Sequence, residues 1–181
     1  MKSLTVKVSS IKFFNWVSIG IILLLFTTNA CAQTSTFTSK DSTLFDFWVG
    51  KWNLTWQNAD GTLGKGENLI EKTLDGKVIQ ENFRDVKGFK GTSISVFNPQ
   101  KLTWHQAWAD NAGGFINLMG EVEGEKRIFK TSPRTVNGNT VIARMVFYDI
   151  KSDSFIWDWE QSKDGGQTWS LNWRINYQRQ K

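Results

Sequence analysis

The chain has 181 residues, with 22 Lys and Arg against 17 Asp and Glu, and a formal net charge of +5. Residues 1–32 hold three of the lysines and no acid, so the remainder carries a net charge of only +2. That balance leaves no basic footprint for nucleic acid, and the single cysteine, Cys31, excludes an internal disulfide. About 150 residues follow residue 32, enough for one domain with a sizeable core.

Residues 1–32 have the pattern of a bacterial-type secretory signal peptide. Lysines precede an apolar run at residues 16–26 that is too short to span a bilayer comfortably. Two processing routes fit. Residues 30–32 satisfy the small-residue rule of signal peptidase, which makes Gln33 the first mature residue, whereas Cys31 is alternatively the lipidated cysteine of a lipoprotein. We therefore predict a periplasmic or extracellular protein, attached to a membrane only through lipidation of Cys31.

The remaining chain has the organisation of a single β-domain. Residues 33–42 are rich in Ser and Thr and are expected to form a flexible leader, and Thr43–Gly50 a short helical plug. From Lys51 on, apolar runs alternate with Asn-Gly, Asp-Gly and related turn sequences, which favour positive φ. About 8–10 strands without helical periodicity indicate a sandwich or barrel. Hairpins throughout favour an antiparallel up-and-down β-barrel over residues 43–181, because closure removes exposed edges.

Tryptophans come in pairs two or four residues apart. Side chains at i, i+2 and i+4 share one face of a strand, so each pair marks a strand with one aromatic side. We expect Trp52, Trp169 and Trp173 to fill the core, and about half of the nine that follow the signal peptide to contact a pocket. The pairs are Trp52 and Trp56, Trp104 and Trp108, Trp157 and Trp159, and Trp169 and Trp173.

The segment Phe45–Trp52 (FDFWVGKW) resembles the F-x-x-G-x-W motif at the start of lipocalin-like (calycin) barrels. In that family a short helical turn closes one end of the barrel, and a Trp on the first strand packs across it. The segments Glu67–Phe83 and Trp169–Arg179 also resemble exported bacterial calycin-like domains of unknown function. The resemblance implies a cup-shaped barrel and implies no activity.

The segment Ser162–Trp169 matches the Asp-box pattern S-x-D-x-G-x-T-W of sialidases and other propeller proteins. In that motif Asp and Thr bond to the backbone of a tight turn, and the Trp packs under it. A propeller needs one copy in each blade, and this sequence has a single copy. We therefore predict a rigid hairpin between the last two strands and no sialidase site.

His105 is the only histidine. Nitrobindins, which are related barrels, hold haem through one proximal histidine, but the corresponding C-terminal strand, Trp169–Tyr177, contains none. His105 also alternates with Trp104 and Gln106, which places it opposite the aromatic side. Without further histidines or cysteines the domain lacks the ligands of a transition-metal site, and no EF-type calcium spacing occurs. We expect no cofactor and no metal.

Four polar residues interrupt apolar runs and are candidates for the barrel interior: Glu81, Gln106, Asn117 and Arg144. Small-molecule pockets are mostly apolar with a few placed polar groups. Burial would raise the pKa of an inward Glu81 unless Arg144 pairs with it. A structural ion pair or a position at the solvated rim is the alternative for each, and a slip of one residue would reverse every assignment.

The leading hypothesis is a monomeric barrel that binds a small apolar or amphipathic molecule in its cup. Glu81 and Arg144 would form the polar end of the pocket. The residues expected to stack on the ligand and orient it are Trp104, Gln106, Trp108, Asn117, Trp157 and Trp159.

Two alternatives stay open. In a cofactor-independent isomerase or lyase, Glu81 would act as a general base, and Arg144 or Gln106 would stabilise an oxyanion. In a plugged barrel that serves as an envelope protein-interaction module, there would be no pocket, and an apolar patch would lie away from the mouth.

Overall fold

The computed structural model describes residues 38–181, which belong to one compact unit. The predicted signal peptide, Cys31 with its two processing routes, and the first part of the predicted leader lie outside these residues. Within the described part of the chain, no helix is long and apolar enough to cross a membrane.

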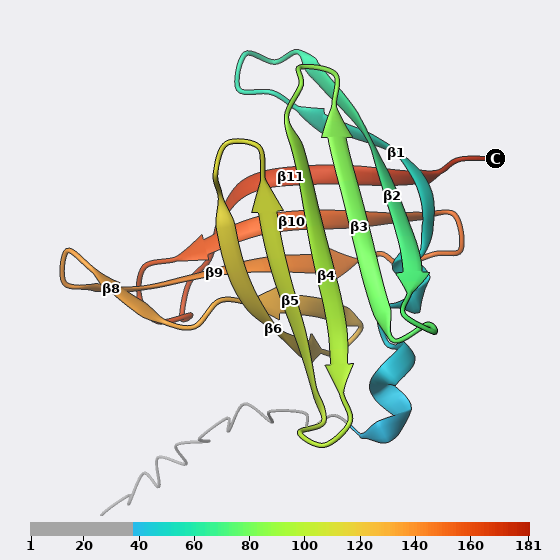
Figure 1. The fold of residues 1–181 in the computed structure, drawn as a ribbon. Coiled ribbons are helices and arrows are strands. Elements are labelled where there is room, and N and C mark those ends of the chain that lie inside the picture. The colour runs from blue at the N-terminus through green and yellow to red at the C-terminus, as the bar shows by residue number, and fades with distance from the viewer. Residues whose placement is uncertain (1–37) are drawn as a thin grey trace, which may run out of the picture. The chain divides into compact units, whose positions relative to one another are not determined.

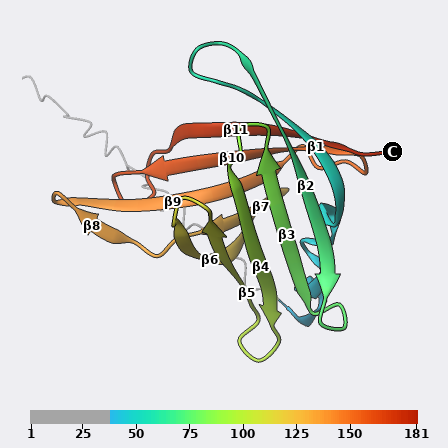
Figure 2. The same cartoon turned by 45° about the horizontal axis from the view of Figure 1, so that its top comes forward.

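The fold is all-β, and its strands form one closed antiparallel barrel (Figures 1 and 2). Each strand from β1 to β6 pairs with the next, β7 pairs with β9, and the ring closes through β9–β10, β10–β11 and β11–β1. Ten strands form the barrel, and β8 forms a hairpin with β9. The strands are β1 Gly50–Gln57, β2 Leu63–Thr73, β3 Val78–Asp85, β4 Lys90–Asn98, β5 Thr103–Asp110, β6 Phe115–Glu123, β7 Lys126–Lys130, β8 Arg134–Val136, β9 Asn139–Tyr148, β10 Ser154–Ser162 and β11 Ser170–Arg179. The predicted barrel is thereby confirmed.

A plug of two short 3-10 helices, η1 Ser39–Thr43 and η2 Asp46–Trp48, precedes β1. Phe45 and Trp48 are completely or almost completely buried. The ring of Phe45 stacks on Phe129 with centroids 4.3 Å apart. The plug therefore fills the end of the barrel at which β1 begins, as the sequence predicts, although η1 starts within the segment expected as the leader.

Arg179 on β11 holds the plug in place. Its Nη1 and Nη2 atoms donate to the carbonyl oxygens of Val49 (2.9 Å) and Phe47 (3.2 Å). Its guanidinium also lies over the ring of Trp52, 4.1 Å from the centroid, a cation–π contact. At Gly50 a Cβ would lie 2.1 Å from Arg179 Nη1, and φ is +143°, so the position requires glycine.

At the other end of the barrel, one glycine makes room for a tryptophan on the neighbouring strand. Gly91 on β4 lies next to Trp108 on β5, and a Cβ on Gly91 would lie 2.0 Å from Cζ2 of that ring. The backbone sets the position of that Cβ, and a hydrogen bond from Trp108 Nε1 to Asp110 Oδ2 (3.1 Å) holds the ring. The position of Trp108 therefore depends on the absence of a side chain at residue 91.

The hairpin between β10 and β11 is the Asp-box turn that the sequence predicts. Asp164 Oδ1 accepts from the backbone N–H groups of Gln167 (3.0 Å) and Thr168 (2.9 Å). Ser162 Oγ accepts from the N–H of Gly166 (2.8 Å), where φ is +96°. Hydrogen bonds from Thr168 hold the pKa of the Asp164 carboxyl well below its usual value. The polar groups of this loop thus serve its own backbone.

The expectation that Trp169 fills the core and shares a face with Trp173 is wrong. The pairing of β10 with β11 shifts between Trp159 and Glu160, so β11 carries one extra residue. This bulge reverses the alternation. Trp173 therefore points inward, whereas Trp169 is half-buried on the outer face beneath Arg144, whose guanidinium lies 3.8 Å from the ring centroid.

We expect Gly91→Ala to lower the free energy of unfolding by about 1–3 kcal/mol, because the added methyl overpacks against Trp108. In a Trp108→Ala background the same change should cost much less, since the clashing ring is gone. Denaturant melts of the four proteins of this double-mutant cycle measure the coupling. Equal costs in the two backgrounds would contradict the assigned contact.

We expect Asp164→Ala to lower the denaturation midpoint, because the turn loses the acceptor of its own N–H groups. Lys163→Ala is the matched control: Lys163 is the exposed neighbour in the same loop, and its removal should leave the midpoint unchanged. Equal midpoints for the two variants, measured by urea titration, would show that the Asp-box bonds do not stabilise the hairpin.

Candidate functional site: an aromatic cavity with a buried carboxyl group

A cavity of about 140 Å³ lies inside the barrel, towards the end opposite the plug. The plug precedes β1, and β3 runs in the same direction as β1, so β3 ends at the opposite end of the barrel. Phe89, in the turn between β3 and β4, therefore lies at that end. The lining is mostly aromatic, and its polar members are a carboxyl group and a phenol. It consists of Glu81, Phe83, Phe89, Trp108, Ile116, Met145, Trp157, Trp159, Trp173, Ile175 and Tyr177.

Three tryptophans from β10 and β11 make one wall. The rings of Trp157 and Trp159 lie nearly parallel, with centroids 6.5 Å apart and planes 9° apart. Trp173 stands edge-on to Trp157 at 5.7 Å and 86°. Trp159 and Trp173 are partly exposed, so flat apolar surfaces remain available to a ligand.

The polar end of the cavity is the Glu81 carboxyl group, in a residue that is only 5% exposed. Asn68 Nδ2 on β2 donates to Glu81 Oε1 (2.6 Å), and Ser93 Oγ on β4 donates to Oε2 (2.7 Å). Asn68 Nδ2 also lies 3.1 Å from the hydroxyl of Tyr177 on β11. Residues of β2 and β4 reach Glu81 because both strands pair with β3.

Burial raises the pKa of Glu81 to about 7, because desolvation penalises the carboxylate. The hydrogen bonds from Ser93 and Asn68 favour the carboxylate and offset part of that rise. Burial, together with the nearby charge of Glu81, raises the pKa of Tyr177 well above its usual value. Among the described residues that line the cavity there is no Lys, Arg or His to neutralise the carboxylate.

Glu81 belongs to a buried polar layer, which also contains Asn68, Ser93, Ser95 and Gln106. This layer contains more hydrogen-bond acceptors than donors. Gln106 Nε2 donates to Ser95 Oγ (3.0 Å) and weakly to Ser93 Oγ (3.4 Å). Among the described residues, Asn68 Oδ1 and Gln106 Oε1 are buried side-chain acceptors without a hydrogen-bond partner. Such atoms are costly when buried, so this layer has capacity for an additional donor.

The structure brings half of the sequence-predicted site residues to the cavity: Glu81, Trp108, Trp157 and Trp159 line it. Gln106 is buried in the adjoining polar layer. Trp104 points inward but lies at the plugged end, where its Nε1 donates to the Asp41 carbonyl oxygen (2.8 Å). Its predicted place in the pocket is therefore wrong.

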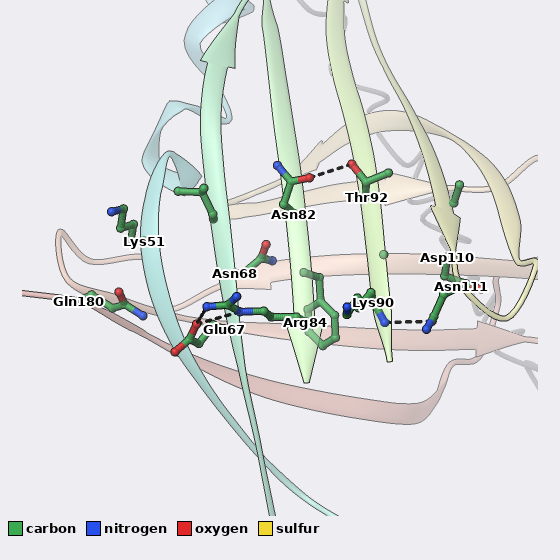
Figure 3. Close-up of a pocket in the computed structure, with 14 residues that line it drawn as sticks. Lys51, Glu67, Asn68, Asn82, Arg84, Lys90, Thr92, Asp110, Asn111 and Gln180 are labelled. Atoms are coloured by element: carbon green, nitrogen blue, oxygen red, sulfur yellow. Dashed lines mark hydrogen bonds and ion pairs between the residues drawn. The ribbon is translucent and has the colours of Figure 1, made fainter. Parts of the chain in front are cut away.

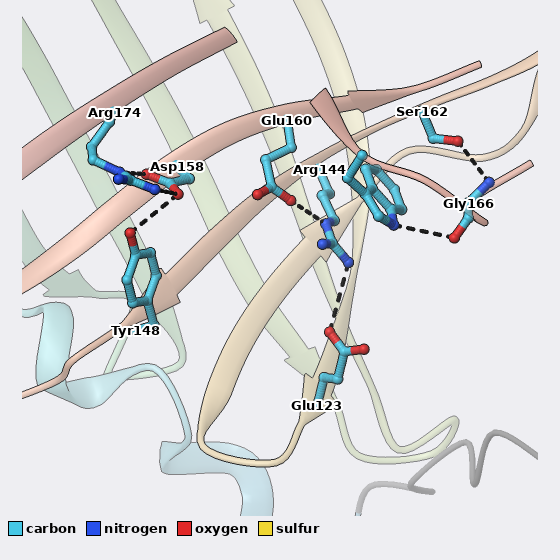
Figure 4. Close-up of polar contacts among 9 residues, drawn as sticks. Glu123, Arg144, Tyr148, Asp158, Glu160, Ser162, Gly166 and Arg174 are labelled. Atoms are coloured by element: carbon cyan, nitrogen blue, oxygen red, sulfur yellow. Dashed lines mark hydrogen bonds and ion pairs between the residues drawn. The ribbon is translucent and has the colours of Figure 1, made fainter. Parts of the chain in front are cut away.

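Asn117 and Arg144 point away from the interior, contrary to the expectation for both. Asn117 is exposed on β6. Arg144 pairs with Glu160 (Nε–Oε2, 2.6 Å) and Glu123 (Nη1–Oε2, 3.6 Å) on the outer face of the barrel (Figure 4). Arg144 therefore does not pair with Glu81.

A second ion pair on the outer face involves β10 and β11. Arg174 donates to both carboxylate oxygens of Asp158 at 2.8 and 2.7 Å, and the Tyr148 hydroxyl lies 3.2 Å from the same carboxylate (Figure 4). Asp158 is 3% exposed, and Arg174 neutralises its charge. These contacts connect β9, β10 and β11 and are consistent with a structural role.

Asn68 and Ser93, which bond to Glu81, and Tyr177, which bonds to Asn68, were not predicted from the sequence. Each has a weak sequence signal: it occupies an inward position of an alternating strand, two residues from an apolar or small inward neighbour. Phe83, Met145 and the other apolar lining residues are indistinguishable in sequence from core residues.

A larger hollow of about 740 Å³ lies on the outer face of β1 to β5 (Figure 3). Part of its charge is already paired: Arg84 bonds to Glu67, with 3.0 Å between Nε and Oε2. The Asn111 side chain accepts from the Lys90 backbone N–H (3.0 Å). This groove is open and solvated, so it desolvates a ligand less than the interior cavity does, and the interior cavity is the better candidate site.

No known protein-family model matches the sequence, and no functionally curated protein is significantly similar to it. Within residues 38–181 no group of three or more His, Cys, Asp or Glu side chains is placed to hold a metal ion.

We expect the buried Glu81 to make stability fall as the pH rises. Its pKa is about 7 in the folded state against an ordinary value of 4.5, so between these values the unfolded chain loses a proton that the folded chain retains. Wild-type protein should lose roughly 3 kcal/mol relative to Glu81→Gln from below pH 4.5 to above pH 7. Denaturant melts across this range measure the difference, and a difference that stays constant or grows in favour of wild type would refute the assignment.

Proposed function

We propose that the barrel binds a small molecule whose apolar body lies among the tryptophans and whose polar group meets Glu81. One observation carries the proposal: an interior cavity whose wall is aromatic and whose polar end presents a single carboxyl group. Pockets that bind small molecules have this composition, with an apolar lining and a few placed polar groups that fix orientation.

The size of the cavity limits the ligand to about one ring. An apolar cavity of about 150 Å³ accommodates benzene, and the volume here is about 140 Å³. Trp159 and Trp173 at the partly exposed side can contact a longer substituent that leaves the cavity. The proposed ligand is therefore a monocyclic or similarly compact molecule.

The enzymatic alternative has one observation in its favour, because a general base works best with a pKa near the operating pH, and that of Glu81 is about 7. The stabilisation of an oxyanion, which this mechanism also needs, has less support. Arg144 lies outside the barrel, and Gln106 does not line the cavity. A developing oxyanion would thus lack the donors that this mechanism assigned to it, and binding without reaction is the better supported function.

The protein-interaction alternative draws on a different part of the surface. Ile94, Phe115 and Met119 are exposed on the outer face of β4 and β6, and exposed apolar patches can mark docking sites. They do not line the cavity. An interaction there would be separate from ligand binding.

The proposed setting is the periplasm or the exterior of the cell. It follows from the signal-peptide pattern of residues 1–32, with lipidation at Cys31 as the alternative to soluble export. We also propose a monomeric state. The closed up-and-down barrel supports the further proposal of kinship with lipocalin-like barrels.

We expect benzyl alcohol to bind saturably, with calorimetric heat and a change in tryptophan fluorescence. Trp159→Ala should weaken binding about tenfold or more, because one face of the cavity is lost. Trp169→Ala is the matched control, since Trp169 is also half-buried but lies on the outer face, and it should leave affinity unchanged. Equal losses in both variants, or no saturable binding of either benzyl alcohol or its amine counterpart benzylamine to folded protein, would overturn the proposal.

A further inference from the structure

We propose that the ligand is a small organic amine, whose protonated nitrogen binds the Glu81 carboxylate while its apolar body lies among the tryptophans. This inference rests on the proposed function and adds the chemical class of the ligand. Three features of the site point to a cation: the unused acceptors around Glu81, the absence of a compensating charge, and the aromatic walls.

The first feature is hydrogen-bonding capacity. Each carboxylate oxygen can accept about two hydrogen bonds, and the oxygens of Glu81 receive one each, from Asn68 and Ser93. An ammonium group has three donors and no acceptor. It therefore matches the unused capacity of the carboxylate, which lines the cavity directly.

The second feature is charge. The neighbours that bond to Glu81, Asn68 on β2 and Ser93 on β4, are neutral, and Asn68 bonds in turn to the titratable hydroxyl of Tyr177 on β11. The described lining contains no basic side chain. An ionised carboxylate without a counter-charge is unfavourable in a buried cavity. A cationic ligand would supply that counter-charge to Glu81.

The third feature is the aromatic wall. Indole rings carry negative potential on their faces and attract cations within about 6 Å. Trp157, Trp159 and Trp173 supply such rings beside the cavity. A carboxylic acid ligand would instead meet both these faces and the negative charge of Glu81.

A neutral ligand that accepts a hydrogen bond from protonated Glu81 is the competing class. The two classes give opposite pH dependences, because an amine requires the carboxylate and a neutral acceptor requires the carboxylic acid. With a pKa of about 7, amine affinity should rise as the pH rises towards neutrality and then level off. Affinity for the neutral acceptor should fall over the same range.

The experiment compares benzylamine with benzyl alcohol, which share the ring and the methylene but differ in charge. Isothermal titration calorimetry on the purified protein is performed at about pH 5 and about pH 8, where benzylamine is protonated. We expect benzylamine to bind roughly 100-fold more tightly at the higher pH, as ionisation of Glu81 requires. At the higher pH it should also bind at least tenfold more tightly than benzyl alcohol.

Glu81→Gln is the decisive variant, because it keeps the size of the side chain and removes its charge. It should abolish both the preference for the amine and its pH dependence, while benzyl alcohol still binds. Benzyl alcohol binding as well as or better than benzylamine to wild type would overturn the amine proposal alone. An amine preference that survives in Glu81→Gln would do the same. If neither probe binds to the folded protein at either pH, the proposed function fails together with this inference.

Discussion

The packing of the plug against the barrel is the contact on which the interior depends. Phe45 and Trp48 fill one end, and Arg179 holds this segment by donating to the backbone carbonyl groups of Phe47 and Val49. The plug fills that end of the barrel, Glu81 is buried, and the cavity lies towards the other end. Desolvation of the Glu81 carboxyl, and hence its raised pKa, follows from this closure.

The barrel class could be predicted from local chemistry. Turn dipeptides such as Asn137-Gly138 divide the sequence into strands, and the structure has positive φ at both residues. The spacing of Trp104 and Trp108 placed the aromatic side of β5 correctly, with Gln106 inward between them. Short-range rules sufficed there because one face of β5 is apolar and the other is not.

The same alternation failed where both faces of a strand are apolar. In β6 the inward residues are Ile116 and Leu118, while Phe115 and Met119 are exposed, so Asn117 was assigned to the wrong face. In β9 the outer face is apolar because the Asp-box hairpin covers part of it, as the contact between Arg144 and Trp169 shows. Long-range pairing decides such cases, and periodicity does not encode it.

A carboxyl group desolvated inside an aromatic cavity titrates near neutral pH, and nuclear magnetic resonance can follow this titration for Glu81. The side-chain carboxyl carbon of Glu81, assigned by comparison with Glu81→Gln, is followed through a pH titration of the folded protein. We expect a midpoint near 7 and a downward displacement of that midpoint when benzylamine is added. A midpoint near the ordinary value of 4.5, unaffected by benzylamine, would contradict this expectation.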